Sequence, residues 1–295
     1  MNVLIGGSNG LIGKELVNRL RLEGHRVICL VRREPFSSDE IQWDIPNRKI
    51  NLKDVSSIDG VIHLGGAPIA DRRWSDSVCE ELRSSRILST ELLVEILKEA
   101  NVNPKVFICA SAIGIYGDRL DEKLTERSSV GRGFLADLTS DWEKMASKAS
   151  IERVISARFG IVLSPRGGAL GKMLLPFRLG VGGKLGAGHH YMSWITLSDA
   201  VSALMFMLEN SNSKGPINIV SPSPVRNEEF TRILGKVLGR PALFPVPSFA
   251  LRLLFGSMVD EVLLSSQRVI PDVLLREGFK FDDSNLETAL SEMLN

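Results

Sequence analysis

Residues 1–13 have the sequence MNVLIGGSNGLIG, in which a short apolar run is followed at once by glycines. The run Val3–Ile5 predicts a buried strand, and the apolar periodicity of Leu11–Leu22 predicts a helix. A second apolar run, Val27–Val31, predicts the next strand. Strand, glycine turn, helix and strand in this order predict the opening unit of an α/β fold with a doubly wound parallel sheet, the Rossmann type.

The glycine spacing of this opening unit is typical of a dinucleotide site. Gly7 makes the tight turn out of the strand, Gly10 lets the backbone approach a diphosphate, and Gly13 lets the helix pack closely on the strand. The amides at the start of the helix then face a phosphate. The predicted cofactor-binding residues of the turn are Gly7, Ser8, Asn9, Gly10, Leu11, Ile12 and Gly13. The alternative is a glycine-rich connection without a ligand.

Two arginines, Arg32 and Arg33, follow the second predicted strand. NAD-binding domains usually have an acidic residue here that accepts a hydrogen bond from the ribose 2′-hydroxyl, whereas guanidinium groups pair with a 2′-phosphate. The sequence therefore predicts NADP(H) as the cofactor. The alternative is that the two arginines only mark a strand end at the surface. The acidic residue Glu34 beside them keeps NAD as a second candidate cofactor.

Composition limits the classes of protein to which the chain can belong. Its 295 residues, 44% of them hydrophobic and 24% charged, suit a globular α/β protein with a sizeable core. The net charge of +1 gives no overall field for nucleic acid or an acidic membrane, so neither is predicted as a partner. No apolar run reaches membrane-spanning length and no signal peptide is evident, which predicts a cytoplasmic protein unless a transit peptide has been removed. Cys29, Cys79 and Cys109 have no metal or CxxC spacing and are predicted to be buried, reduced thiols.

The rest of the chain continues the alternation of strands and helices up to about residue 160. Predicted strands are Ile41–Asp44, Gly60–Leu64, Val106–Cys109 and Val154–Phe159, predicted helices are Ser77–Ala100 and Phe134–Ala149, and Asp118–Gly133 is a predicted loop. His63 lies in an apolar run and is predicted to be a satisfied, partly buried histidine.

Beyond residue 160 the glycines crowd together and the elements shorten. Predicted there are a strand at Ser193–Ile195, a helix at Asp199–Leu208, a strand at Pro216–Val220 and helices from Asn227 onward. We expect an NADP-binding domain at 1–160 and a smaller substrate-binding lobe that takes up most of 161–295, with some segments returning to the sheet.

Several motifs together resemble one family. They include GGSNGLIG at 6–13, RRW at 72–74, SSR at 84–86, SAIGIYG at 111–117, WE at 142–143, RFGIVLS at 158–164, GGAL at 167–170, GGKLGAG at 182–188, SWI at 193–195 with Asp199, and SQRVIP at 266–271. Over essentially the whole chain they resemble the extended short-chain dehydrogenase/reductases, and most closely the atypical branch named epimerase family protein, some members of which carry a cell-division-inhibitor label.

The resemblance implies roles for individual residues. Arg32 would meet the adenosine phosphate, the backbone of Leu64 and Gly65 would contact the ribose side, and Arg86 would reach toward the dinucleotide. Ser111 matches the site serine at the end of the fifth strand, and Val162 lies in the loop that borders the nicotinamide.

The usual catalytic pair of such reductases is missing. They use a Tyr-x-x-x-Lys pair for proton transfer, but the two tyrosines here, Tyr116 and Tyr191, are followed four residues later by Leu120 and Ile195. In the helix where the pair belongs, the sequence has Leu135 and Thr139. Ser111 and Tyr116 are therefore the candidate catalytic residues, with His189, His190 and Tyr191 as further proton donors. The alternatives are a structural serine for Ser111, an aromatic wall for Tyr116 and a plain surface loop for the histidines.

The substrate-pocket candidates are Arg73, Trp74, His189, His190 and Trp194, with Arg72 beside Arg73. The Arg72–Arg73 pair suits an anionic ligand, although a solvated surface pair is the alternative. No His, Cys or Asp cluster has metal spacing. Three functions follow: an NADP(H)-dependent oxidoreductase acting on an unknown small carbonyl or hydroxyl compound, a catalytically silent NADP(H)-binding regulator of a protein partner, and, third, a nucleotide-sugar epimerase. The oligomeric state is not predicted.

Overall fold

The computed structural model describes residues 1–52, 57–99 and 102–294. Within these ranges the main sheet has eight strands in the order β12-β8-β6-β5-β1-β2-β3-β4. All neighbours are parallel except β4, which runs antiparallel to β3. The strands are β1 (Asn2–Gly6), β2 (Arg26–Val31), β3 (Glu40–Asp44), β4 (Lys49–Ile50), β5 (Gly60–His63), β6 (Val106–Ala112), β8 (Arg153–Phe159) and β12 (Gly215–Ile219). The prediction of an α/β fold with a doubly wound parallel sheet is confirmed.

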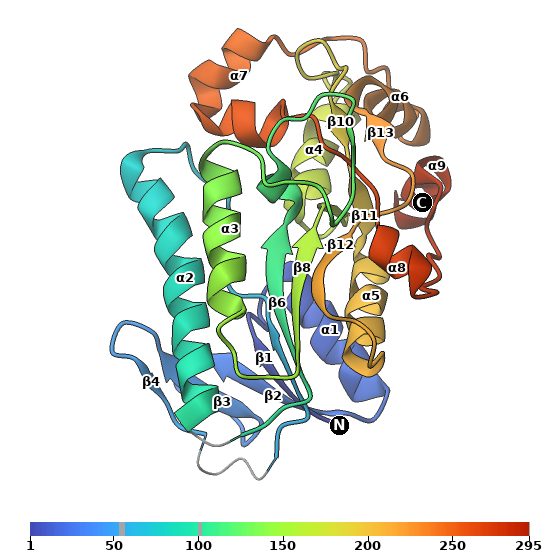
Figure 1. Ribbon diagram of the computed structural model, residues 1–295. Coiled ribbons are helices and arrows are strands. Elements are labelled where there is room, and N and C mark those ends of the chain that lie inside the picture. The colour runs from blue at the N-terminus through green and yellow to red at the C-terminus, as the bar shows by residue number, and fades with distance from the viewer. Residues whose placement is uncertain (53–56, 100–101, 295) are drawn as a thin grey trace.

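Helices cover both faces of this sheet (Figure 1). α2 and α3 pack together on one face, and α1 and α5 pack together on the other. Their bounds are α1 (Leu11–Leu22), α2 (Asp76–Glu99), α3 (Phe134–Ala146) and α5 (Leu197–Glu209). Because both faces are covered, the central strands are almost uninterrupted runs of buried Val, Ile, Leu and Phe.

A smaller lobe lies over the carboxyl ends of the strands. It contains α4 (Gly168–Arg178), α6 (Asn227–Val237), α7 (Ser248–Phe255), α9 (Leu286–Leu294) and the single π turn η2 (Val259–Leu263). The short helix α8 (Asp272–Arg276) packs against β12, with Leu274 in the core of the main sheet. Short strand pairs join it to the loops at the sheet edge: β9 (Ile161–Leu163) with β11 (Trp194–Thr196), β10 (Tyr191–Met192) with β13 (Val225–Arg226), and β7 (Lys123–Leu124) with β14 (Arg268–Val269). A separate core between α4, α6 and α9 stabilises this lobe.

The predicted division at residue 160 does not separate the sheet from the lobe. The segment Pro216–Val220, predicted as a strand, forms β12 and pairs with β8 in the main sheet. α5 also returns and packs on α1, with Leu208 against Gly60 of β5. β12 and α5 are therefore segments beyond residue 160 that return to the main sheet, as the prediction allowed.

Several predicted bounds need small corrections. β6 continues past Cys109 to Ala112 and leads into the 3₁₀ turn η1 (Ile113–Tyr116), α3 ends at Ala146 rather than Ala149, and the predicted loop 118–133 includes β7. The predicted helix end at Ala100 lies outside the described residues. Cys29 and Cys109 are buried free thiols, but Cys79 on α2 is only half-buried. Among the described residues, no helix combines the length and apolarity that crossing a bilayer requires.

Candidate functional site

The glycine turn between β1 and α1 has the close packing that its sequence predicts. Gly7 has a φ of +83°, and a Cβ there would lie 2.7 Å from the backbone N of Gly65. A Cβ on Gly13 would lie 2.2 Å from the Gly7 carbonyl oxygen, so helix and turn touch at this point. A Cβ on Gly10 would meet nothing closer than 3.4 Å. The open side of the turn is therefore at Gly10, where a diphosphate approaches in dinucleotide folds.

The N-terminus of α1 is available to an anion. Its N-cap residue is Gly10, and no side chain caps the helix. The first amides of a helix lack intrahelical acceptors and carry the positive end of the helix dipole. A phosphate at Gly10 would supply the missing acceptors.

The two arginines after β2 differ in their surroundings. Arg33 makes a bidentate ion pair with Glu40, at 2.6 and 2.8 Å, and its guanidinium lies 3.8 Å from the centre of the Phe36 ring. The hydrogen bonds from Arg33 lower the pKa of Glu40 to about 2. Arg32 makes no hydrogen bond or ion pair with any residue that the structure describes. Arg32 is therefore the guanidinium that is free to meet a phosphate at this strand end.

Arg86 on α2 is a buried cation without a carboxylate partner among the described residues. Its side chain donates to the carbonyls of Leu82 and Ala67, each at 3.0 Å, and lies against Gly66 after β5. Burial lowers the pKa of Arg86 to about 10. An uncompensated buried cation is costly, so an anion near the loop after β5 would stabilise it. Leu64 and Gly65, predicted to contact the cofactor through backbone, lie in the same loop.

The smaller lobe completes this site. A Cβ on Gly168 would lie 3.4 Å from the Val162 carbonyl and 3.5 Å from the Leu11 side chain, so the loop after β9 lies beside the glycine turn. Arg166 in that loop pairs with Glu15 of α1 at 2.7 Å. The structure thus gathers the predicted turn residues, Arg86 and Val162 around one edge of the sheet, and their geometry suits a dinucleotide diphosphate.

The two candidate catalytic residues lie inside a buried network (Ser111 4% exposed, Tyr116 fully buried). Ser111 donates to a carboxylate oxygen of Glu143 at 2.5 Å, and Glu143 makes a bidentate ion pair with Arg158 at 2.7 and 2.8 Å. Arg158 also donates to the Tyr116 hydroxyl at 2.8 Å, which in turn donates to Asn218 at 2.7 Å. The hydroxyl protons of Ser111 and Tyr116 are therefore committed to protein acceptors.

This network bears on the predicted proton-donor role of Tyr116. Burial raises the pKa of its phenol, although Arg158 acts in the opposite direction. A catalytic tyrosine of a reductase needs a lowered pKa and contact with the substrate. Tyr116 has a raised pKa and a hydroxyl held between Arg158 and Asn218, which favours the alternative of an aromatic wall.

The helix α3 places apolar and structural groups where the usual catalytic pair would lie. Leu135, Thr139 and Glu143 are spaced four residues apart and therefore share one face of the helix. Leu135 and Thr139 are buried, and Leu135 packs against Gly114 of η1. The sequence motifs included Glu143 and Arg158 but suggested no role for them. The signal that could have found the pair was a charged residue, Arg158, near the carboxyl end of a buried strand.

The substrate-pocket candidates fall into two groups, and no hydrogen bond or ion pair among the described residues links them. Trp74 donates to the Ile69 carbonyl at 2.8 Å and packs against Phe134, while Arg73 is exposed and lies against Gly256. Arg72 makes an exposed ion pair with Glu81 of α2.

The second group lies around β10. His189 is exposed, and its carbonyl accepts a hydrogen bond from Arg226 at 2.9 Å. The Nε2 atom of His190 is buried without a partner in the described structure, and burial lowers the pKa of this histidine. Tyr191 has Arg226 and Arg268 over its ring at 4.9 and 5.1 Å. Trp194 is fully buried in the core of the smaller lobe and donates to Ser223, so the prediction that it lines a pocket is wrong.

Glu261 is a further residue that sequence analysis missed. Its carboxylate oxygens, on η2, accept hydrogen bonds from the Phe134 and Leu135 amides at 2.9 and 2.7 Å. It therefore caps the N-terminus of α3 from a segment more than 120 residues later in the chain. No local sequence signal marks such a cap, because its partner comes from tertiary structure.

Sequence comparison gives the family to which this geometry belongs. Residues 3–220 match the NAD dependent epimerase/dehydratase family, and residues 246–293 match a domain of unknown function, DUF1731. An epimerase family protein of Mycobacterium bovis is 43% identical over 290 residues, which are 98% of this chain and 96% of the relative. One from Staphylococcus aureus is 36% identical over 299 residues, 99% of this chain and 98% of the relative.

Solved structures agree with the sequence relatives. The human epimerase family protein SDR39U1, solved with NADPH, is 34% identical with a TM-score of 0.90 and 99% coverage of both chains. A nucleoside-diphosphate sugar epimerase from Corynebacterium glutamicum is 34% identical with a TM-score of 0.82, covering 100% of this chain and 58% of its own. With its eight-stranded sheet and glycine turn, the chain described here belongs to the NAD dependent epimerase/dehydratase family, within the extended short-chain dehydrogenase/reductases.

Proposed function

We propose that the chain binds NADP(H) across the turn between β1 and α1. The observation that carries the proposal is the difference between the two arginines after β2: Glu40 holds Arg33, whereas Arg32 has no partner among the described residues. The open side of the turn at Gly10 and the buried cation Arg86 support an anionic dinucleotide. The NADPH bound to the similar human protein supports the same choice of cofactor.

Nucleotide titration tests this proposal. NADPH is expected to bind more tightly than NADH, and Arg32→Asp is expected to weaken NADPH binding about tenfold to a hundredfold, because charge-assisted hydrogen bonds to the 2′-phosphate are lost. Arg33→Gln is the matched control and leaves the preference for NADPH in place. Equal affinities for the two nucleotides before and after the Arg32 substitution would contradict the assignment.

We further propose that the protein is an oxidoreductase for a small carbonyl or hydroxyl compound. When bound, the nicotinamide supplies or accepts the hydride. The chain contributes the binding and orientation of the dinucleotide through the glycine turn, Arg32 and Arg86. Because Ser111 and Tyr116 direct their protons into the protein, the proton exchanged with substrate comes from His189, His190 or solvent. General acid catalysis contributes about 10²- to 10⁴-fold, so a slow reductase is expected.

A carbonyl library tests the reaction. The purified protein is mixed with NADPH and each compound, and loss of reduced nicotinamide absorbance is followed. At least one carbonyl is expected to be reduced, with activity lost in Arg32→Asp at limiting NADPH. If the wild type and the Arg32→Asp variant consume NADPH at the same rate, that consumption is background and not enzymatic turnover.

A second candidate function is a silent NADP(H)-binding regulator. The observation that favours it is the burial of Ser111 and Tyr116 together with the apolar Leu135 in the catalytic helix. NADPH would then protect the amides of the lobe from hydrogen exchange while no carbonyl is reduced. A nucleotide-sugar epimerase ranks third, because that reaction needs a competent base twice on one substrate.

A further inference from the structure

Two segments of the smaller lobe carry charge of one sign. Residues 168–190 and 230–259 contain seven Lys or Arg residues and no Asp or Glu, although the whole chain has 36 basic and 35 acidic residues. Acids from elsewhere in the chain pair with three of the seven, at Lys172, Lys236 and Arg252. The other four make no ion pair with any described residue: Arg178, Lys184, Arg232 and Arg240.

The two segments lie side by side and expose large apolar side chains. Leu185 forms a bridge to Val246, and the backbones of Gly183 and Phe244 touch. Eight apolar side chains of α4, α7 and the loops beside them are each at least 58% exposed: Leu175, Leu179, Val181, Leu243, Phe244, Phe249, Leu253 and Leu254. We call these eight residues the apolar ridge. Figure 1 shows α7 at the outer end of the molecule, beyond the carboxyl ends of β6 and β8.

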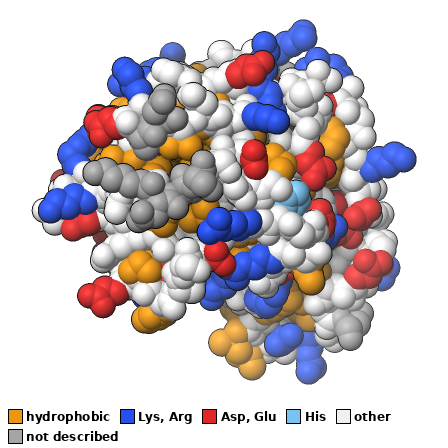
Figure 2. Space-filling view, turned by 90° about the horizontal axis from the view of Figure 1, so that it is seen from below, with side chains coloured by type: hydrophobic (Ala, Val, Ile, Leu, Met, Phe, Trp, Pro, Cys, Tyr) orange, Lys and Arg blue, Asp and Glu red, His pale blue; other side chains and the backbone are white. Residues whose placement is uncertain are grey.

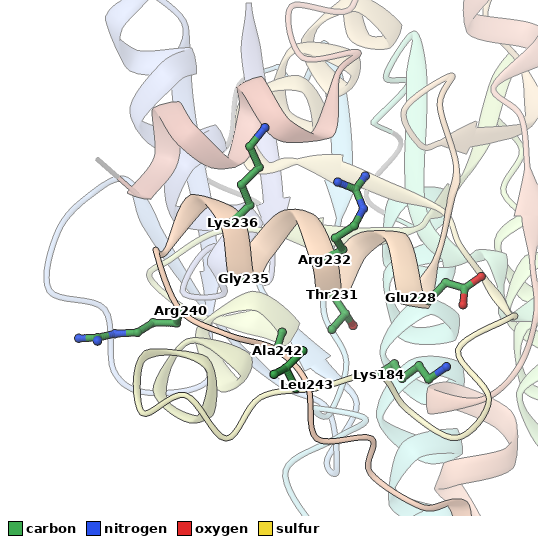
Figure 3. A pocket seen from close by; sticks show the side chains of 9 residues that line it. All are labelled: Lys184, Glu228, Thr231, Arg232, Gly235, Lys236, Arg240, Ala242 and Leu243. Atoms are coloured by element: carbon green, nitrogen blue, oxygen red, sulfur yellow. The ribbon is translucent and has the colours of Figure 1, made fainter.

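The basic side chains beside the ridge do not converge on one point. A groove of about 290 Å³ lies between α6 and the segment 240–243, and Lys184 and Glu228 also line it. Figure 3 shows the heads of Arg232 and Lys236 on the side of α6 away from the groove and the head of Arg240 pointing outward. A small anion needs convergent donors, which this groove lacks. Cations that are spread out instead suit a broad surface on which negative charges are also spread out.

The charge also argues against a second copy of the chain on the ridge, because a symmetric contact would bring the same uncompensated cations together. The opposite end of the molecule differs, since acidic and basic side chains are interspersed there (Figure 2). Exposed apolar patches that protrude beside basic residues are the features of proteins that lie on anionic membranes.

We propose that the apolar ridge is a docking surface for an anionic lipid bilayer. Phe249, Leu253 and Leu254 of α7 enter the boundary between headgroups and acyl chains, and Arg178 and Arg240 meet lipid phosphates. The interaction is peripheral, because α7 has only eight residues. The overall charge of +1 conceals this surface, which explains why composition alone predicted no membrane partner.

Vesicle cosedimentation of the full chain tests the proposal. Binding is expected to vesicles of phosphatidylcholine mixed with phosphatidylglycerol and to be weaker on phosphatidylcholine alone. Phe249→Ser and Leu253→Ser should each weaken partitioning about tenfold. Arg178→Gln and Arg240→Gln should each weaken it about fivefold at low salt, with the difference lost at high salt.

Leu22→Ser is the matched control, because Leu22 is a fully comparable exposed leucine (84% exposed) on α1, outside the ridge. It should leave partitioning unchanged. Equal NADPH affinity in all variants shows that they remain folded. Absence of binding to anionic vesicles, or equal binding by the ridge variants and the wild type, overturns the proposal. Ridge-dependent binding to polyglutamate without binding to vesicles overturns the lipid assignment in favour of an acidic protein partner.

Discussion

An added methyl group at Gly13 would lie 2.2 Å from the Gly7 carbonyl oxygen and 2.9 Å from Ser8 Cα. Both neighbours are backbone atoms, so neither can move away cheaply. We expect Gly13→Ala to lower the free energy of unfolding by about 1–3 kcal/mol, as overpacking does. Urea denaturation measures this change.

Gly10→Ala is the matched comparison within the same turn. The nearest atom to its Cβ is 3.4 Å away, and the residue has an ordinary extended backbone with φ −74°. Stability should therefore change by less than about 1 kcal/mol. NADPH affinity should fall, because the methyl group occupies the side from which a phosphate approaches. Equal stability of the Gly13 and Gly10 variants would show that the helix does not press on the turn.

His63 gives a pH dependence that belongs to a single residue. It is fully buried, and its Nε2 atom lies 2.9 Å from the Ser89 hydroxyl. Its Nδ1 atom has no hydrogen-bond partner in the described structure. The predicted hydrogen bonding of this histidine is therefore present at one ring nitrogen and absent at the other. Burial, and then the charge of Arg86, lowers its pKa from 6.5 to about 4. The unfolded chain therefore binds a proton at a pH where the folded chain does not.

Stability should decline as the pH falls from about 6.5 to about 4, with a loss from this residue of about 3 kcal/mol. The measurement is the free energy of unfolding against pH for the wild type and His63→Gln. The wild-type curve should fall more steeply than the His63→Gln curve over that interval. Parallel curves for the wild type and His63→Gln would remove His63 as the cause.

At the scale of elements, α3 depends on a residue from the smaller lobe. The helix starts after Gly133, which has no side chain to cap it, and the Glu261 carboxylate accepts from its first two amides. We expect Glu261→Ala to destabilise the protein by about 1–2 kcal/mol, because two amides lose their acceptor and a negative charge leaves a helix N-terminus.

Asp260→Ala is the control for this cap. Asp260 is next in sequence and, among the described residues, pairs only with exposed Arg252, so its loss should cost less than about 0.5 kcal/mol. Thermal unfolding of the two variants compares them directly. A similar change in melting temperature for both would mean that the cap contributes no more than a surface ion pair.

The elements themselves could largely be predicted from the sequence, and the buried network could not. Apolar periodicity identified α1, α2 and α3, because one face of each packs on the sheet. The glycine turn was identified because glycine spacing reflects backbone contacts within one βαβ unit. By contrast, the network joins Ser111 to Glu143 and Tyr116 to Asn218 across separate elements, and only the sheet register places Arg158 beside Ser111. Sequence spacing contains no such information.

At the scale of the whole molecule, the sheet is not complete within residues 1–160. β12 covers the edge of β8, and α5 covers one face, with Ala200, Val201 and Leu204 buried. The apolar run Pro216–Val220 has the same pattern whichever sheet it joins, so its position could not be predicted from the run alone. The same limit applies to Trp194, which the sequence suggested for the pocket and the structure places in a core.

The fragment 1–160 is therefore expected not to fold cooperatively. Without α5 and β12 it would expose the apolar face and the edge that they cover, and burial of such surface is the main stabilising contribution to a domain. Chemical denaturation followed by far-ultraviolet circular dichroism should show a broad transition for the fragment and a cooperative one for the full chain. A cooperative transition in the fragment would establish residues 1–160 as an autonomous domain.

The late arrival of β12 has a consequence for synthesis on the ribosome. A nascent chain that has emerged as far as β8 has every strand of the sheet except the last, and the backbone groups along one side of β8 have no acceptor or donor. Such an edge recruits other strands until its own partner emerges almost sixty residues later. The time taken to translate codons 160–219 therefore sets how long this edge of β8 stays without its partner strand in the nascent chain.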